Sequence, residues 1–215
     1  MNSLIQQYMQ RLKKKLAIRP SPQLLVHAIE LFHGATEQLT QIAKQTRHVR
    51  FACQKGCAHC CSLRVEVLPP EAFFISNHIK TWPQAQQASL IKRLEQHVLY
   101  ADERSFVQYN RPCPFLTANG ACSIYAVRPH KCRANLSLNV QPCIETGDGQ
   151  EDTALKSAHG QLAIQTILFY KHKKLVMNPA ELGASVLAAL TNSGLQQEWA
   201  QGVQVFKLLP EKIQF

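Results

Sequence analysis

Apolar residues recur at helical spacing over most of the chain, with polar residues between them. In the first run, one side of a helix would carry Leu4, Ile5, Tyr8, Met9, Leu12 and Leu16. Ser21 followed by Pro22 is a typical signal for the start of a second helix. Apolar positions extend this helix to Arg47, and Gly34 is a weak point in it. The sequence therefore predicts two amphipathic helices before the first cysteine.

The same reading predicts further helices and one strand. "RVEVL" (64–68) alternates and predicts a short strand, and "PPEAFFISNHIK" (69–80) predicts a helix beginning at its prolines. Thr81 and Pro83 repeat the start signal for the next helix, and residues 151–174 predict a long one. Asn178 to Glu181 resembles a capping box before another helix, and a last short helix contains Trp199.

Residues 110–149 interrupt this helical pattern. Prolines, glycines and the pair Asn119-Gly120 punctuate a segment too broken for long helices. A loop-rich stretch of this length is unusual in a compact domain unless something else orders it. We predict a mainly α protein, with helices framing a loop-rich, cysteine-lined metal site and at most short strands. It would be a single domain, 1–215, with a cysteine-cluster core at about 51–145 and helical flanks at 1–50 and 151–215.

The cysteines indicate the chemistry of this region. Four lie within "CQKGCAHCC" and four in the loop-rich segment, and the predicted ligands are Cys53, Cys57, Cys60, Cys61, Cys113, Cys122, Cys132 and Cys143. Thiolates two or three residues apart can bind one ion or cluster from a single turn. Gly56 lies where such a loop needs an unusual backbone angle, and Lys55 and His59 would lower the pKa of nearby thiols. Adjacent thiols such as Cys60 and Cys61 would serve two centres, or only one of them would be a ligand.

Other interpretations of the cysteines are weaker. Cys53, Cys57 and Cys60 match radical S-adenosylmethionine enzymes in spacing, but this chain lacks the alternating strands and helices of those barrels. No cysteine stands beside a dedicated base, as a nucleophile would. Inert buried thiols remain an alternative, with Cys143 the first candidate. His59 and His130 lie near cysteines, and we leave both out of the ligand set.

Charge and hydropathy bear on location and partners. Net charge is +10, and up to Arg64 ten lysines and arginines stand against two acidic residues. A solvated helix face is the simplest interpretation; an acidic protein, nucleic acid or a membrane surface are alternatives, although aromatic residues do not interleave as on a nucleic-acid platform. The N-terminus lacks a secretory pattern, and no stretch predicts a membrane span. We expect a cytoplasmic protein whose thiols serve metal or redox chemistry.

A series of motifs follows "CQKGCAHCC": Cys113-Pro114-Phe115-Leu116, Cys122 before Ile124-Tyr125, and Arg128-Pro129 before Cys132-Arg133. With these motifs, residues 51–145 resemble the bacterial YkgJ-like cysteine-cluster family, a zinc- or iron-chelating domain. "SLNVQPCIE" is similar to one branch of the family, which favours Cys143 as a ligand. Arg128 and Arg133 would donate to cluster sulfurs or an anionic substrate, or form ordinary salt bridges.

The resemblance implies bound iron or zinc and iron–sulfur chemistry. A similar cluster in flagellin lysine methylases makes protein modification one implied activity, although no separate motif for a methyl donor is present. We expect iron, held as an iron–sulfur cluster, with Zn²⁺ as the alternative. One hypothesis is an enzyme or electron carrier acting on a small molecule or a protein. The other is a non-enzymatic binding module, in which a closed structural zinc site accompanies a basic face that docks an acidic partner.

Overall fold

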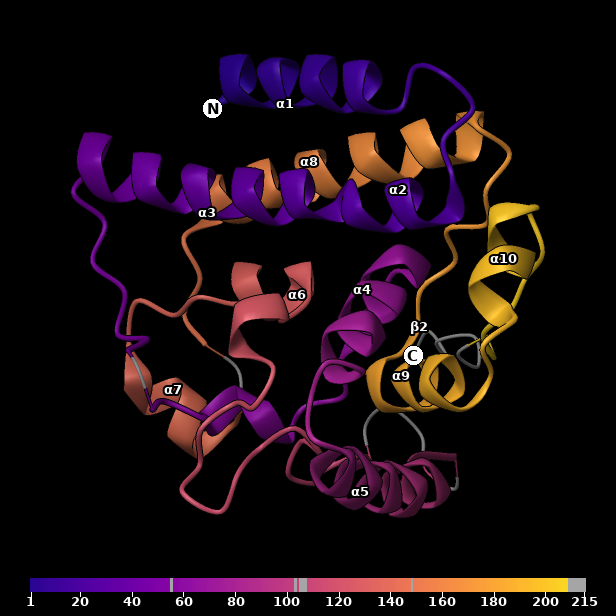
Figure 1. Ribbon diagram of the computed structural model, residues 1–215. Coiled ribbons are helices and arrows are strands. Elements are labelled where there is room, and N and C mark those ends of the chain that lie inside the picture. The colour runs from indigo at the N-terminus through magenta and orange to yellow at the C-terminus, as the bar shows by residue number, and fades with distance from the viewer. Residues whose placement is uncertain (55, 103, 105–107, 148, 209–215) are drawn as a thin grey trace.

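The computed structural model describes residues 1–54, 56–102, 104, 108–147 and 149–208, and this part of the chain is mainly α-helical (Figure 1). Its elements in chain order are α1 (Asn2–Lys15), α2 (Pro22–His27), α3 (Ile29–Thr46), the 3₁₀ helix η1 (His59–Ser62), β1 (Glu66–Val67), α4 (Pro69–Ile79), α5 (Gln84–Asp102), the 3₁₀ helix η2 (Tyr125–Val127), α6 (His130–Ala134), α7 (Val140–Glu145), α8 (Thr153–His172), β2 (Ala180–Glu181), α9 (Leu182–Thr191) and α10 (Leu195–Ala200).

The long helices form two neighbouring groups. α3 packs against both α1 and α8, which also contact each other, and α4 packs against α9, which also contacts α5. Figure 1 shows α1, α3 and α8 running along one edge of the molecule, with α6 and α4 below them and α9 and α5 farther from that edge. The fully buried side chains at the centre include Phe32, Tyr170 and Trp199. The shorter elements that carry cysteines lie beside this helical frame.

Most predicted helices are present, but two details were wrong. The second predicted helix is divided at Ala28 into α2 and α3, and Gly34 lies inside α3 without interrupting it. Ala28 keeps right-handed helical angles while its N–H bonds both Leu24 O and Val26 O, so the division is a local tightening of the helix. The capping box at Asn178 is not formed, because Glu181 caps α9 through a bond from Ala184 N–H at 2.6 Å.

The strand in "RVEVL" is confirmed in shorter form. β1 pairs antiparallel with β2, with Val67 opposite Ala180. α4 then begins at Pro69, and the Glu71 side chain accepts the Leu68 N–H at 3.1 Å. This pairing joins the segment after the first cysteines to the C-terminal helices. In the described part of the chain, the apolar runs within helices are too short to cross a bilayer.

Candidate metal centre

The eight cysteines come from several short segments beside the helical frame. Cys53 and Cys57 lie in the loop after α3, and Cys60 and Cys61 lie in η1. Cys113 and Cys122 precede η2, while α6 and α7 carry the last two cysteines. Every one is a free, half-buried thiol. The predicted thiols are therefore available as metal donors, and none forms a disulfide.

Gly56 adopts φ 90°, the left-handed backbone that the loop was predicted to need. Lys55 lies outside the described residues. His59 is exposed, and its positive charge is one of the smaller causes that favour the Cys60 thiolate, after hydrogen bonds from Cys61 and Asn135. The backbone angle of Gly56 thus agrees with the prediction. Of the two residues expected to lower thiol pKa values, His59 is the one that the described part of the chain includes.

Ser137 connects the first cysteines with the last one. Its main-chain N–H donates to Cys53 Sγ at 3.2 Å, and its carbonyl accepts the Ala52 N–H at 2.8 Å. A methyl group added to Gly149 would lie 2.8 Å from Ser137 Cβ and 3.3 Å from Cys143 Sγ. α7, which carries Cys143, also packs against η1. Residues far apart in sequence therefore meet around one serine.

A tight turn brings Cys113 and Cys122 toward each other. Leu116 and Cys122 form an antiparallel bridge, and Gly120 at the turn has φ 75°. The Cys113 N–H donates to the Cys61 carbonyl at 2.7 Å, which fixes this turn to η1. The pair Asn119-Gly120, which punctuates the sequence here, therefore lies in a turn between the two cysteines.

Arg133 connects α6 by hydrogen bonds to the segment that follows Cys122. Its guanidinium donates to the carbonyls of Ala126 at 2.6 Å and Arg128 at 2.7 Å, and it pairs with Glu37 on α3. Arg128 lies 3.9 Å above the Tyr125 ring and donates to the Tyr125 carbonyl at 3.1 Å. Of the two roles foreseen for these arginines, the structure favours structural bonding, which positions Cys132.

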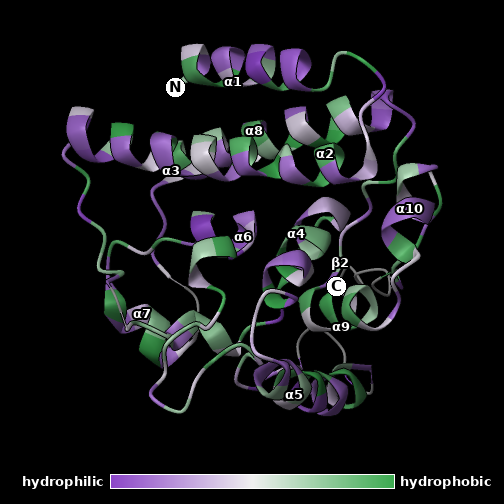
Figure 2. Ribbon diagram, viewed as in Figure 1, coloured by the Kyte–Doolittle hydropathy of each residue, from purple (hydrophilic) through white to green (hydrophobic). Residues whose placement is uncertain are grey.

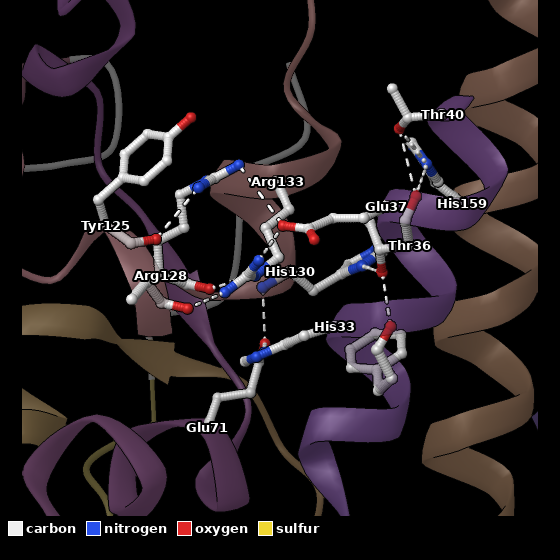
Figure 3. A network of polar contacts seen from close by, with 12 residues as sticks. His33, Thr36, Glu37, Thr40, Glu71, Tyr125, Arg128, His130, Arg133 and His159 are labelled. Atoms are coloured by element: carbon white, nitrogen blue, oxygen red, sulfur yellow. Dashed lines mark hydrogen bonds and ion pairs between the residues drawn. The ribbon is translucent and has the colours of Figure 1, made fainter. Parts of the chain in front are cut away.

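Behind α6 lies a buried polar network that sequence reasoning missed (Figure 3). Glu71 Oε1 accepts the His130 main-chain N–H at 2.6 Å and contacts His33 Nε2 at 2.9 Å. His130 Nδ1 lies 2.8 Å from Thr36 Oγ1, and His159 Nε2 lies 3.1 Å from the Thr36 carbonyl. These residues come from four helices, so no local pattern pointed to them. The one local signal is at Glu71, which directly follows the two prolines that begin α4.

Burial determines the charge states in this network. Desolvation lowers the pKa of His130 to about 4, so its imidazole is neutral near pH 7. Burial alone would raise the pKa of Glu71, but His33 and the His130 N–H outweigh it and lower that pKa below its usual value. His130 is thus held by Thr36 and stacked on Phe32 at 4.4 Å between ring centroids.

The thiols themselves are mostly held as neutral groups. Burial raises the pKa of Cys113 to about 12, and it also raises the pKa values of Cys53, Cys122 and Cys132. Cys60 differs, since a hydrogen bond with the neighbouring Cys61 lowers its pKa to about 6 and raises that of Cys61. Thiolates are the metal-binding form, so metal binding here must displace protons.

The donors fit zinc or iron in kind, but their spacing does not form a coordination sphere. Half-buried thiols are the ligands that structural zinc and iron–sulfur clusters use. Among the residues that the structure describes, no three or more His, Cys, Asp or Glu side chains are grouped so that they could hold a metal ion. The eight-cysteine ligand set therefore stays a prediction.

Comparison with known proteins agrees with the cysteine motifs. Residues 52–156 match the model of a family named CxxCxxCC, whose description is "Putative zinc- or iron-chelating domain". The match covers all eight cysteines and confirms the family resemblance that their spacing indicated. No curated protein and no solved structure gives a significant match to the chain.

Proposed function

Because the chain carries a cysteine-cluster domain of the zinc- or iron-chelating family at residues 52–156, we propose that it holds iron as an iron–sulfur cluster through its clustered thiolates. The observation that carries this proposal is the presence of eight free, half-buried thiols within the matched residues. That number exceeds the four that a single zinc ion needs, and the surplus favours cluster or redox chemistry. When bound, a cluster supplies single-electron transfer.

The protein's own residues prepare this site. Ser137 N–H donates to Cys53 Sγ and Arg133 positions α6, so two of the donor segments are already held without metal. Main-chain donors to sulfur stabilise thiolate character and are typical supports of cluster ligands. The family resemblance implies one of two activities, that of an oxidoreductase or that of a lysine methylase-like enzyme.

A closed zinc site in a non-enzymatic binding module is the second candidate. It is favoured by the exposed basic residues of the N-terminal region, among them Arg11, Lys13, Lys14 and Arg19, which would face an acidic partner. In Figure 2 most of α1 has the colour of hydrophilic residues. A four-thiolate zinc site orders loops well and requires no assembly machinery.

The test is the metal and acid-labile sulfide content of protein purified without oxygen, together with its absorption spectrum. Brown protein with iron and sulfide in comparable amounts supports the cluster. Colourless protein with stoichiometric zinc supports the binding module. Folded protein that contains neither metal contradicts both proposals. Cys57→Ser and Cys132→Ser should each lower the metal content, and variants that fold normally with full metal would refute the ligand assignment.

A further inference from the structure

A surface groove lies between α1 and α8, away from the cysteines. The α1/α8 groove has a volume of about 760 Å³, and its walls are formed by residues 2–13 of α1 and 161–165 of α8. Below it, the buried hydroxyls of Tyr8 and Thr166 bond each other at 2.8 Å and hold the two walls together. Both walls lie outside residues 52–156, so the family description gives this surface no role.

The lining of the groove combines an apolar stripe with side-chain amides. Ile5 is buried at its floor, next to the half-buried Met9. Ile164 is 56 % exposed, and Leu168, one turn further along α8, is 55 % exposed. Amides recur at every fourth position along both walls: Asn2, Gln6 and Gln10 on α1, and Gln161 and Gln165 on α8. The groove thus offers apolar contact flanked by groups that donate and accept hydrogen bonds.

Both walls have positive charge and no carboxylate. Residues 1–16 and 153–174 contain neither Asp nor Glu. The last turn of each helix is basic, with Lys13, Lys14 and Lys15 on α1 and Lys171 on α8. Among the described residues, the ion pairs to carboxylates involve other cations. Figure 1 shows α1 and α8 running in the same direction, so their basic ends lie at one end of the groove. This potential complements an acidic partner.

We propose that the α1/α8 groove docks an acidic amphipathic helix of a partner protein. The apolar face of that helix would cover Ile5, Met9 and Ile164, and its carboxylates would lie near Lys13 and Lys171. A helix seated between two helices completes their packing and is a common mode of recognition. The inference rests on the basic docking face of the second candidate function, and it adds the position of that face and the form of the partner.

Other occupants fit this surface less well. A second copy that presented the same groove would bring the lysines of both copies together. A flat bilayer would reach the exposed Ile164 and Leu168 but not Ile5 at the floor. Nucleic acid would leave the apolar floor uncovered, and the lining residues that the structure describes include no aromatic side chain for stacking. The helix is the occupant that uses the floor, the amides and the lysines together.

The test uses two synthetic peptides as probes. Both have about 18 residues, long enough to form a helix on binding, and share one leucine stripe at helical spacing. One peptide has glutamates beside this stripe, and the other has lysines at the same positions. Fluorescence anisotropy measures their binding to the full-length protein. The acidic peptide should bind at least about tenfold more tightly, and its affinity should fall as the salt concentration rises.

Two substitutions in the groove test its position. Lys13→Glu and Ile164→Asp should each weaken binding of the acidic peptide about tenfold. Both residues are exposed, so the far-UV circular dichroism should stay that of wild type. Lys92→Glu and Leu99→Asp make the same changes of charge at exposed positions of α5, away from the groove. These two controls should bind the peptide as wild type does.

The zinc content of the same samples separates this inference from the metal proposals. If zinc-loaded protein binds neither peptide, or binds both equally, the docking groove is overturned and metal binding stands. Equal losses in Lys13→Glu and Lys92→Glu would show unspecific attraction and overturn it as well. Phosphatidylglycerol vesicles or duplex DNA that bind in place of the peptide, and are lost in Lys13→Glu, would assign the groove to lipid or nucleic acid. Metal-free protein that still shows the expected peptide preference would support the groove while the metal proposals fail.

Discussion

At the scale of single residues, Glu71 joins three parts of the molecule. Its Oε1 atom accepts the His130 N–H at the start of α6 and contacts His33 on α3, while Oε2 accepts the Leu68 N–H before α4. The carboxylate is 2 % exposed, so water does not replace these bonds. A buried charge with several donors is costly to leave incomplete. Glu71 therefore positions the helix that carries Cys132.

We expect Glu71→Gln to lower the free energy of unfolding by about 3 kcal/mol. The carboxylate accepts from three donors through two oxygens, whereas the neutral amide has one oxygen and cannot satisfy all three. Metal retention should fall with it, since α6 loses its main anchor. Urea unfolding and metal content measure the two effects. Glu37→Gln is the control, since Glu37 pairs with Arg133 while 55 % exposed, and it should cost under about 1 kcal/mol. Equal stability of Glu71→Gln and wild type would contradict the role given to Glu71.

Asp152 provides a prediction that depends on pH. It caps α8 by accepting the Leu155 N–H at 2.7 Å, and Arg47 donates to both carboxylate oxygens. The hydrogen bonds from Arg47 hold the pKa of Asp152 below its usual value. The stabilisation is therefore present above the unfolded pKa of about 3.9 and is lost as pH falls through the folded pKa.

Asp152→Ala should therefore cost about 1 kcal/mol at pH 7 and progressively less below pH 4. Urea unfolding of variant and wild type at pH 7 and at a pH below 4 measures this difference. Glu151→Ala is the neighbouring control, because Glu151 pairs with the exposed Lys156, and its effect should be close to zero. A cost for Asp152→Ala that is independent of pH would mean that the charge is not involved.

At the scale of elements, the sequence predicted those structures that have their own periodicity or start signals. α1 has a repeating apolar face, and α4 begins at the predicted prolines. α6 and α7 extend only over His130–Ala134 and Val140–Glu145, too short for a periodic pattern, and tertiary bonds such as those of Arg133 fix them. The division at Ala28 likewise has no local signal, because alanine favours an uninterrupted helix.

In the candidate site, too, local features could be predicted from the sequence and tertiary features could not. Cysteine identity and the turn at Gly120 could be predicted, since both depend on local residues. The network of His33, Glu71, His130 and His159 could not, because its members are buried together only by the packing of separate helices. Which thiols share a neighbourhood is a tertiary property as well, and Ser137 had no recognisable role in the sequence.

Gly149 tests the contact between α7 and the first cysteine loop. An alanine methyl group there would lie 2.9 Å from Ser137 Oγ and crowd Cys143 Sγ, so Ser137 or α7 must shift. We expect Gly149→Ala to lower the free energy of unfolding by about 1–3 kcal/mol and to reduce the metal retained by the protein. Urea unfolding measures the change in stability, and zinc retention against a chelator measures the change in metal binding.

Gly160→Ala is the matched control for this substitution. Gly160 lies inside α8 with open space around it, so alanine should be neutral or stabilise the protein by up to about 1 kcal/mol. If Gly149→Ala has the same free energy of unfolding as Gly160→Ala and keeps full metal, the segment around Ser137 does not support metal binding.

At the scale of the whole molecule, the hydrophobic core and the cysteine loops have different supports. The buried cluster extends through α1, α3, α4, α8 and α9 and includes Phe32, Leu39 and Trp199. A chain of 215 residues can bury enough apolar surface to fold without a metal. The cysteine segments instead depend on short helices and scattered bonds, such as those made by Ser137.

Removal of metal should therefore open the loops and leave the helices folded. We expect chelation under reducing conditions to keep the far-UV circular dichroism signal, while limited proteolysis becomes faster within 52–64 and 110–150, because local opening exposes segments with few stabilising contacts. Peptide mapping of the cleavage sites, with metal-restored protein as the control, measures this. Loss of the helical signal together with the metal would mean that the metal supports the entire fold and would contradict the independence of the helical core.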